Sequence, residues 1–235
     1  MTLKLYYARP SAYARPVWLA LLEKQLPFEL IPVDLSGEQF QPEFLAVNPF
    51  GRVPVLVDGD HRVVESLAIL DYLEAQYPNP SLMPQAPHHI ATVRMVQLIT
   101  LNELLPALFR LLTQPKNLNQ ASDAQQTELA YARSRASSTL KFLARLLGEK
   151  PYFAGDQLTL AEIVAGTVIH RLPELGIALQ PRLAHWSERL LARPTWQQIA
   201  LSPAEQRDFQ RYMRVLPKIW QRRRRQKLKA LTQGP

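Results

Sequence analysis

Residues 48–58 read Asn-Pro-Phe-Gly-Arg-Val-Pro-Val-Leu-Val-Asp, and residues 65–73 read Glu-Ser-Leu-Ala-Ile-Leu-Asp-Tyr-Leu. The first stretch begins with turn residues and continues as a β-rich run that ends at the hairpin signal Asp58-Gly59-Asp60. In the second stretch, apolar residues recur at helical spacing after Ser66 and stop before Pro78. This part of the chain is therefore expected to form a β-hairpin followed by a helix.

The same alternation of short strands and helices extends upstream. Leu3–Tyr7 and Phe28–Val33 are predicted to be strands, and the apolar-rich run Arg15–Lys24 between them is predicted to be a helix. Glu38–Val47 is expected to form a further short helix. The predicted order up to residue 77 is β-α-β-α-β-β-α.

The pattern changes after a proline-rich stretch, residues 78–88, which is predicted to link two domains. Beyond it the β signal disappears. Long amphipathic helices are expected over His89–Thr113 and Gln125–Leu147, with shorter ones over Leu183–Leu191 and Pro194–Leu201. The predicted domains are 1–77, an all-helical 89–201, and a C-terminal helix with a basic tail, 202–235.

Composition limits the possible chemistry. The chain has 235 residues and no cysteine, which excludes disulfides, thiolate metal sites and a protein thiol nucleophile. The five histidines have no metal-ligand spacing, so no metal site is expected. The N-terminus lacks a signal-peptide pattern, and the longest uninterrupted apolar run is Val17–Leu22. These features predict a cytoplasmic protein.

The net charge of +8 is concentrated at the C-terminus. Nine of the 28 basic residues follow residue 210, which leaves 19 basic against 20 acidic residues before it. The run Arg222–Arg225 is interpreted as a solvated tail. Contact with nucleic acid or an anionic membrane is the less favoured alternative.

The loop after the first strand is polar and leads into a helix. It reads Ala-Arg-Pro-Ser-Ala-Tyr-Ala-Arg over residues 8–15. A helix N-terminus carries partial positive charge and favours anions. Ser11 is therefore interpreted either as the cap of this helix or as a hydroxyl that donates to a substrate thiolate.

Two other motifs also allow two interpretations. Pro54 fits a trans proline at a strand start, which the sequence alone favours, or a cis bond that turns the backbone of Val53 towards an extended peptide. Ser66 taken alone is a good helix N-cap. With Glu65 it is also suited to the carboxylate and ammonium groups of a ligand.

The order of these motifs closely resembles the glutathione transferase family, whose pattern is Asn-Pro-x-Gly-x-Val-Pro-x-Leu followed by Glu-Ser-x-Ala-Ile-x-x-Tyr-Leu. The resemblance extends to about residue 201 and includes Gly155-Asp156, Thr159, Ala161, Glu162, Trp186 and Arg193-Pro194. It implies an α/β thioredoxin-like N-terminal domain, an all-α C-terminal helical domain and a homodimer. Glutathione is implied as co-substrate, with no permanently bound cofactor.

The resemblance also implies roles for individual residues. Val53, before a cis Pro54, is similar to the family's partner of the cysteinyl backbone. Glu65 and Ser66 are similar to its clamp for the γ-glutamyl group. Arg52 lies next to the region that holds the glycyl carboxylate.

The thiol-activating residue is implied by spacing within the family. In Ser-type members similar to the theta and delta classes, a Ser stands four residues before an Arg that opens the first helix. Ser11 stands in this relation to Arg15 and is the first candidate. The loop matches no class well, and the other candidates are Tyr6, Tyr7, Arg9 and Tyr13. Cys-type classes similar to omega and lambda are excluded.

The expected second substrate is a small apolar electrophile, such as an aryl halide or an isothiocyanate, bound between the domains. The candidate residues of its pocket are Tyr13, Leu104, Leu105, Phe109 and Leu112. Helical spacing of the same leucines also fits a core. The rival interpretations are a non-catalytic binding or scaffold protein of this fold and a glutathione-dependent peroxidase or isomerase.

Overall fold

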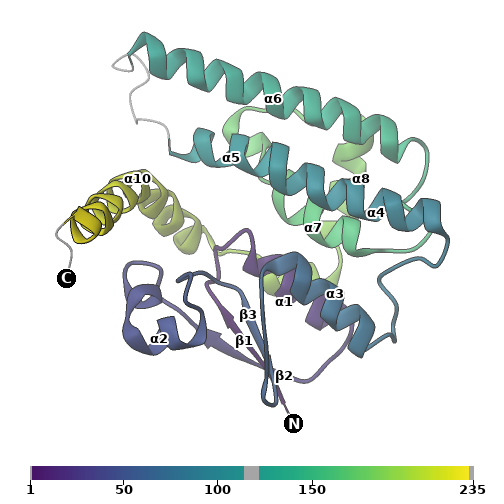
Figure 1. Ribbon diagram of the computed structural model, residues 1–235. Helices are drawn as coiled ribbons and strands as arrows, with labels where there is room; N and C mark the ends of the chain where they lie inside the picture. Colours follow the sequence, from purple (N-terminus) through teal and green to yellow (C-terminus); the bar gives the residue numbers. More distant parts are fainter. Residues whose placement is uncertain (1, 114–121, 233–235) are drawn as a thin grey trace.

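A four-stranded mixed sheet forms the N-terminal part of the chain. The computed structural model describes residues 2–113 and 122–232. The strands are β1 (Leu3–Tyr7), β2 (Phe28–Pro32), β3 (Val55–Asp58) and β4 (His61–Val64), in the order β2-β1-β3-β4 (Figure 1). β1 is parallel to β2 and antiparallel to β3, which is antiparallel to β4. This confirms the predicted order of strands.

Alternating side chains of β1 pack against different helices. Leu3 and Leu5 belong to the main core with α1 (Ala14–Glu23) and α3 (Ser66–Gln76). Tyr6 packs against a smaller cluster that includes Phe44 of α2 (Pro42–Val47). This alternation follows from the two-residue period of a strand.

The expected helix over Glu38–Val47 is divided in two. A 3-10 helix covers Glu38–Phe40, and α2 begins at Pro42. Proline has no backbone N–H to continue a helix that precedes it, but it fits the first turn of a new one.

Helices make up the rest of the described chain. They are α4 (Pro87–Ile99), α5 (Leu105–Leu112), α6 (Asp123–Leu147), α7 (Leu160–Ile169), α8 (Pro181–Leu191), α9 (Pro194–Ile199) and α10 (Pro203–Thr232), with a 3-10 helix at Pro173–Leu175. In Figure 1 they lie above the sheet, with α1 and α3 between the two parts. One continuous apolar core joins the helices to β1, α1 and α3.

The long helix predicted over His89–Thr113 contains a π-helical segment, Thr100–Leu104, between α4 and α5. Pro106 explains the interruption, because its ring would clash with the carbonyl four residues before it in a regular helix. The helical stretch Pro87–Leu112 has the length and mean hydropathy, 1.4, of a membrane-spanning helix. Half of its 18-residue apolar window is buried inside the protein, as in a core helix.

Helix α7 is the most deeply buried element of the helical part, and each of its residues is buried. The predicted capping box is present at its start. Thr159 Oγ1 accepts from the N–H of Ala161 at 3.2 Å, and the Glu162 carboxylate accepts from the N–H of Thr159 at 3.0 Å. Gly166 is required because an added Cβ would lie 2.3 Å from the Trp196 ring.

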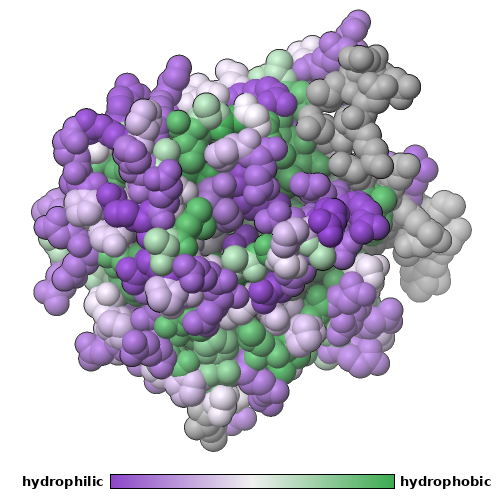
Figure 2. Space-filling view, turned by 180° about the vertical axis from the view of Figure 1, so that it is seen from behind, coloured by the Kyte–Doolittle hydropathy of each residue, from purple (hydrophilic) through white to green (hydrophobic). Residues whose placement is uncertain are grey.

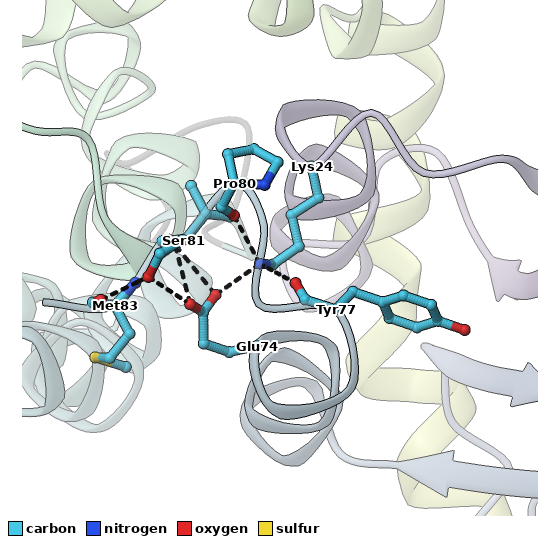
Figure 3. Close-up of polar contacts among 7 residues, drawn as sticks. Lys24, Glu74, Tyr77, Pro80, Ser81 and Met83 are labelled. Atoms are coloured by element: carbon cyan, nitrogen blue, oxygen red, sulfur yellow. Dashed lines mark hydrogen bonds and ion pairs between the residues drawn. The ribbon is translucent and has the colours of Figure 1, made fainter. Parts of the chain in front are cut away.

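A buried lysine joins α1 to the segment after α3 (Figure 3). The Nζ of Lys24 donates to the carbonyls of Tyr77 and Pro80 at 2.8 and 2.9 Å and pairs with Glu74 at 2.8 Å. Glu74 in turn accepts from the Ser81 hydroxyl at 2.7 Å. The ammonium group therefore has three acceptors away from water, which satisfies the requirement for burying a charge.

The C-terminal helix packs back on both parts of the molecule. Phe209 and Met213 of α10 are buried in the main core, and the Tyr212 hydroxyl donates to the Leu35 carbonyl at 3.0 Å. Arg225 is exposed, whereas the side chains of Arg222–Arg224 lie outside the described residues. The role of the basic tail stays a prediction. On the face opposite to Figure 1, hydrophilic residues dominate, with hydrophobic residues in patches (Figure 2).

Candidate functional site

Three loops meet at one end of the sheet. Val55, the first residue of β3, pairs with Tyr6 of β1 on one side and with Val64 of β4 on the other. The loop after β1, the segment before β3 and the start of α3 after β4 are therefore neighbours. Ser11, Val53–Pro54 and Glu65–Ser66 all lie in these loops.

Ser11 is fixed at the start of α1. Its Oγ accepts from the N–H of Ala14 at 3.2 Å, and its backbone carbonyl accepts from the N–H of Arg15 at 3.0 Å. The hydroxyl hydrogen has no acceptor among the described residues, and the side chain is partly exposed. Ser11 therefore accepts from the first N–H of α1 without being its N-cap residue, which is Tyr13, and it keeps its own donor available.

Val53 lies outside the strand ladder, which begins at Val55. The Val53–Pro54 peptide bond is cis, as the family resemblance implies, and differs from the trans bond that the sequence alone favours. No hydrogen bond joins the Val53 backbone to another residue in the described part of the chain. Both of its polar groups are available to an extended peptide ligand.

Ser66 does not cap α3, which corrects the interpretation that the sequence alone favours. Glu65 occupies the cap position, with φ of 70°, and Ser66 is the first helical residue. The Ser66 hydroxyl makes no hydrogen bond within the described ranges. A positive φ at a residue other than glycine costs roughly 1–3 kcal/mol, which is characteristic of functional sites.

Charges of opposite sign lie around Tyr13, which is 39% exposed. Burial of part of the ring raises the pKa of Tyr13, the charge of Arg52 lowers it and the charge of Glu65 raises it. Arg52 and Glu65, on different loops, therefore act on the same hydroxyl. The Tyr13 ring stacks on Phe109 of α5, with 6.4 Å between centroids.

The residues predicted to line an electrophile pocket differ in burial. Leu104 and Leu105 are fully buried in the main core, so they belong to the interior and not to a pocket wall. Leu112 is 8% exposed. The helical spacing could not separate these leucines from Phe109, which lies at the surface of the core beside Tyr13.

The other candidate activating groups have structural contacts. Tyr6 packs edge-on against Phe44, and Tyr7 packs edge-on against Trp18. Arg9 lies over Trp18, donates to the Ala200 carbonyl at 3.0 Å and pairs with Glu205 at 2.7 Å. These contacts direct Arg9 towards the C-terminal helices.

A cationic cluster beside α1 was missed by sequence reasoning. Arg15 and Arg171 are 4% and 6% exposed, and neither guanidinium has a hydrogen bond or ion pair to a described residue. Burial, together with the charges of Arg171 and Arg9, lowers the pKa of Arg15 to about 10. No motif links residues 156 positions apart, so the sequence carries no signal for this cluster.

Taken together, the loops offer a hydroxyl donor at a helix N-terminus, a free backbone edge and a carboxylate beside a free serine. This set suits an extended peptide with an anionic group near Ser11. The described residues contain no group of three or more His, Asp or Glu side chains that could hold a metal ion.

Comparisons with known proteins agree with this arrangement. Residues 5–81 match the profile described as "Glutathione S-transferase, N-terminal domain", and residues 95–194 match "Glutathione S-transferase, C-terminal domain". The chain is 36% identical to glutathione S-transferase 3 of Zea mays over 83% of this chain and 91% of that protein. It is 31% identical to maleylacetoacetate isomerase of Pseudomonas aeruginosa over 88% and 98% of the two chains.

A solved structure shares the fold over nearly its whole length. The theta class glutathione S-transferase from Xanthomonas axonopodis pv. citri, with glutathione bound, has a TM-score of 0.74 and 27% sequence identity. The similarity covers 86% of this chain and 98% of that one. Sequence, sheet topology and these relatives lead to the same conclusion: the chain belongs to the glutathione S-transferase family.

Proposed function

We propose that this protein conjugates the glutathione thiolate to small apolar electrophiles such as aryl halides and isothiocyanates. The observation that carries the proposal is the geometry of Ser11. Its oxygen accepts from the Ala14 N–H while its hydrogen stays available, one turn from the start of α1. A bound thiolate there would receive a hydrogen bond and the favourable field of the helix.

The interactions available near Ser11 are strong enough to favour ionisation of the glutathione thiol. A free cysteinyl thiol has a pKa of about 8.5. Lowering it by two units takes about 2.7 kcal/mol. A charge-assisted hydrogen bond from Ser11 contributes roughly 1.5–3 kcal/mol. The helix N-terminus adds about 0.3–1 kcal/mol. No permanently bound cofactor is part of the proposal.

In this mechanism the peptide lies across the three loops. Glu65 pairs with the γ-glutamyl ammonium, and the free Ser66 hydroxyl donates to the adjacent carboxylate. The Val53 backbone pairs with the cysteinyl residue, and Arg52 serves the glycyl carboxylate. The thiolate then attacks the electrophilic carbon beside Tyr13 and Phe109. In a substitution, a C–S bond forms and the bond to the leaving halide breaks.

The test compares Ser11→Ala with the wild type in conjugation of 1-chloro-2,4-dinitrobenzene. We expect kcat to fall roughly 10- to 100-fold, because the lost hydrogen bond stabilises only the anion. The pH at which kcat/KM is half-maximal should rise. Retention on immobilised glutathione should change little.

Other substitutions separate activation from binding. Glu65→Ala and Ser66→Ala should weaken retention on glutathione, while Ser137→Ala on the exposed side of α6 serves as control. Unchanged turnover in Ser11→Ala would contradict the assigned role, and the same assay on Tyr6, Tyr7, Arg9 and Tyr13 variants would follow. Absence of retention by the wild type would favour a scaffold protein of this fold.

A glutathione-dependent isomerase is the second candidate function. It is supported by the 31% identity to a protein named maleylacetoacetate isomerase. Both activities need the same thiolate, but an isomerase regenerates it without a net conjugate. Mass analysis of the product distinguishes them, because a conjugate retains the glutathione mass.

We also propose a homodimer that uses the outer face of α4 and α6. Met95, Leu98 and Tyr131 are 36%, 49% and 60% exposed there. Tyr131 also lines a hollow between the two helices, together with Ile99 and Phe142. Light scattering should give twice the chain mass of 26.9 kDa, and Leu98→Glu should reduce it. A monomeric wild type would exclude the dimer.

A further inference from the structure

Two arginines beside α1 are buried without a hydrogen-bond partner. Arg15 lies in the first turn of α1, and Arg171 follows the last residues of α7. The Nε of Arg15 and the Nη2 of Arg171 are inaccessible to solvent and unsatisfied within the described residues. A buried charge that is not paired costs several kcal/mol, so natural proteins rarely retain one.

The neighbouring charges increase this cost. Arg171 and Arg9 both act on Arg15, and each carries the same sign. Arg9 is neutralised by Glu205, whereas Glu174 acts on both buried guanidiniums but forms no ion pair with either in the described chain. The two guanidiniums therefore have only a distant carboxylate and no direct ion pair within the described residues.

The cluster lies close to the proposed reaction site. The N–H of Arg15 donates to the Ser11 carbonyl at 3.0 Å, so the two residues are one helical turn apart. On the other side, the Arg171 guanidinium lies 4.9 Å from the centre of the Phe209 ring of α10. The two cations thus lie among α1, α7 and α10, and the backbone of Arg15 is one helical turn from Ser11.

We propose that Arg15 and Arg171 bind the carboxylate of the second substrate, so that this protein takes carboxylate-bearing electrophiles. The inference rests on the proposed function. In that proposal the two carboxylates of glutathione face Ser66 and Arg52, on the other loops of the site. A carboxylate is planar and has two oxygens that accept hydrogen bonds. Two guanidiniums, one on each side of it, can each donate two N–H groups to these oxygens, so a pair of arginines suits this group.

A suitable reaction is substitution on 4-chloro-3-nitrobenzoate. The thiolate forms a C–S bond at the carbon that carries chlorine, and chloride leaves with the electrons of the C–Cl bond. The thiol proton has already passed to water on ionisation. The carboxylate stays unchanged throughout and serves only to bind, so the reaction needs no further reactant.

The experiment compares this acid with 4-chloro-3-nitrobenzamide, which has a neutral group at the same position. Each kcat/KM is divided by the uncatalysed rate constant with glutathione. We expect the wild type to favour the acid at least tenfold, and Arg171→Gln to abolish that preference. Arg171→Lys should retain part of it. Arg110→Gln removes an exposed charge from α5 and should leave the preference unchanged.

A binding measurement gives a readout that does not depend on turnover. Benzoate should raise the melting temperature of the wild type and of Arg110→Gln, but not of Arg171→Gln. Chloride and phosphate at equal ionic strength form the comparison series. Equal stabilisation by all three anions, with no preference for the acid in catalysis, would overturn the proposal in favour of a general anion site.

Failure of the two proposals can be told apart. Turnover of 1-chloro-2,4-dinitrobenzene without any preference for the benzoate would overturn the carboxylate site and leave the transferase function intact. Absence of all conjugation would overturn the transferase function. In that case stabilisation by benzoate that disappears in Arg171→Gln still supports a carboxylate site, and its absence contradicts one.

Discussion

Hydroxyl side chains at three helix starts have different roles. Thr159 caps α7 and is itself fully satisfied by Glu162. Ser11 accepts from the first N–H of α1, although Tyr13 is the N-cap residue, and keeps its hydrogen available. Ser66 caps nothing, because the chain enters α3 through the positive φ of Glu65. The Ser66 side chain therefore has no structural hydrogen bond, and it follows directly after the exposed Glu65.

At the same scale, Lys24→Met should destabilise the protein by about 3–5 kcal/mol, because it leaves Glu74 and two carbonyls without their buried donor. Denaturant unfolding monitored by circular dichroism measures the change. Lys141→Met, at an exposed position of α6, is the matched control and should change stability by less than roughly 0.5 kcal/mol. Similar values for both variants would show that the Lys24 network contributes little.

At the scale of elements, prolines stand at the start of half of the described α-helices. α2, α4, α8, α9 and α10 each begin with a proline at the first position, where its missing N–H costs nothing. Pro106 instead lies inside a continuous helical stretch and produces the π-helical segment. The positions of the predicted helices therefore agree with the structure. The interruptions within those helices depend on the backbone geometry of proline.

The end of α7 should make stability depend on pH. Burial, together with the charges of Arg15 and Arg171, lowers the pKa of His170 to about 4. The contact of its ring with the Gly166 carbonyl acts in the opposite direction. The folded state therefore favours neutral imidazole. Its contribution is fully present above the unfolded pKa of about 6.5 and is lost as pH falls towards 4.

The expected loss is roughly 2 kcal/mol by pH 5. The measurement is the free energy of unfolding of wild type and His170→Gln at pH 7 and pH 5. Because the variant has no imidazole to protonate, its stability should fall less over that interval. An equal fall in both proteins would show that His170 does not titrate in this way.

At the scale of the whole molecule, the C-terminal helix closes the structure. α10 starts in the helical part, covers Arg171 with Phe209 and reaches the N-terminal part through Tyr212 and Leu35. Glu205 adds an ion pair to Arg9 in the loop that carries Ser11. The last segment of the fold therefore contacts the loop at the proposed site.

Truncation separates the packed half of α10 from its basic end. A chain that ends at Ser202 loses the buried Phe209 and Met213 and should be less stable by about 3–5 kcal/mol. A chain that ends at Leu216 retains both and should unfold like the full chain. Thermal and denaturant unfolding test this expectation, and equal stability of all three proteins would contradict it.

The shorter truncation also tests the basic tail. If the tail is solvated, full chain and the chain ending at Leu216 should show the same weak binding to anionic vesicles and to DNA. Loss of binding on removal of the tail would instead support the alternative that Arg222–Arg225 contacts phosphate-bearing partners.

The order of the elements and the positions of the motifs follow from local sequence, because hydrophobic period, proline and capping residues act within a few positions along the chain. The hairpin after Val53, the helix after Ser66 and the capping box of Thr159 and Glu162 could all be predicted in this way. Each of these features depends on local backbone geometry, which is the same whatever fold surrounds it.

Which side chains are buried, and which have hydrogen-bond or ionic partners, depends instead on the tertiary structure. Leu104 and Leu105 have the same helical spacing as Phe109, yet they lie in the core because α5 packs against α6. Arg15 and Arg171 meet because α1 packs against α7, and no local pattern records that contact. Burial and pairing depend on residues distant in the chain, so they emerge only when the elements are assembled.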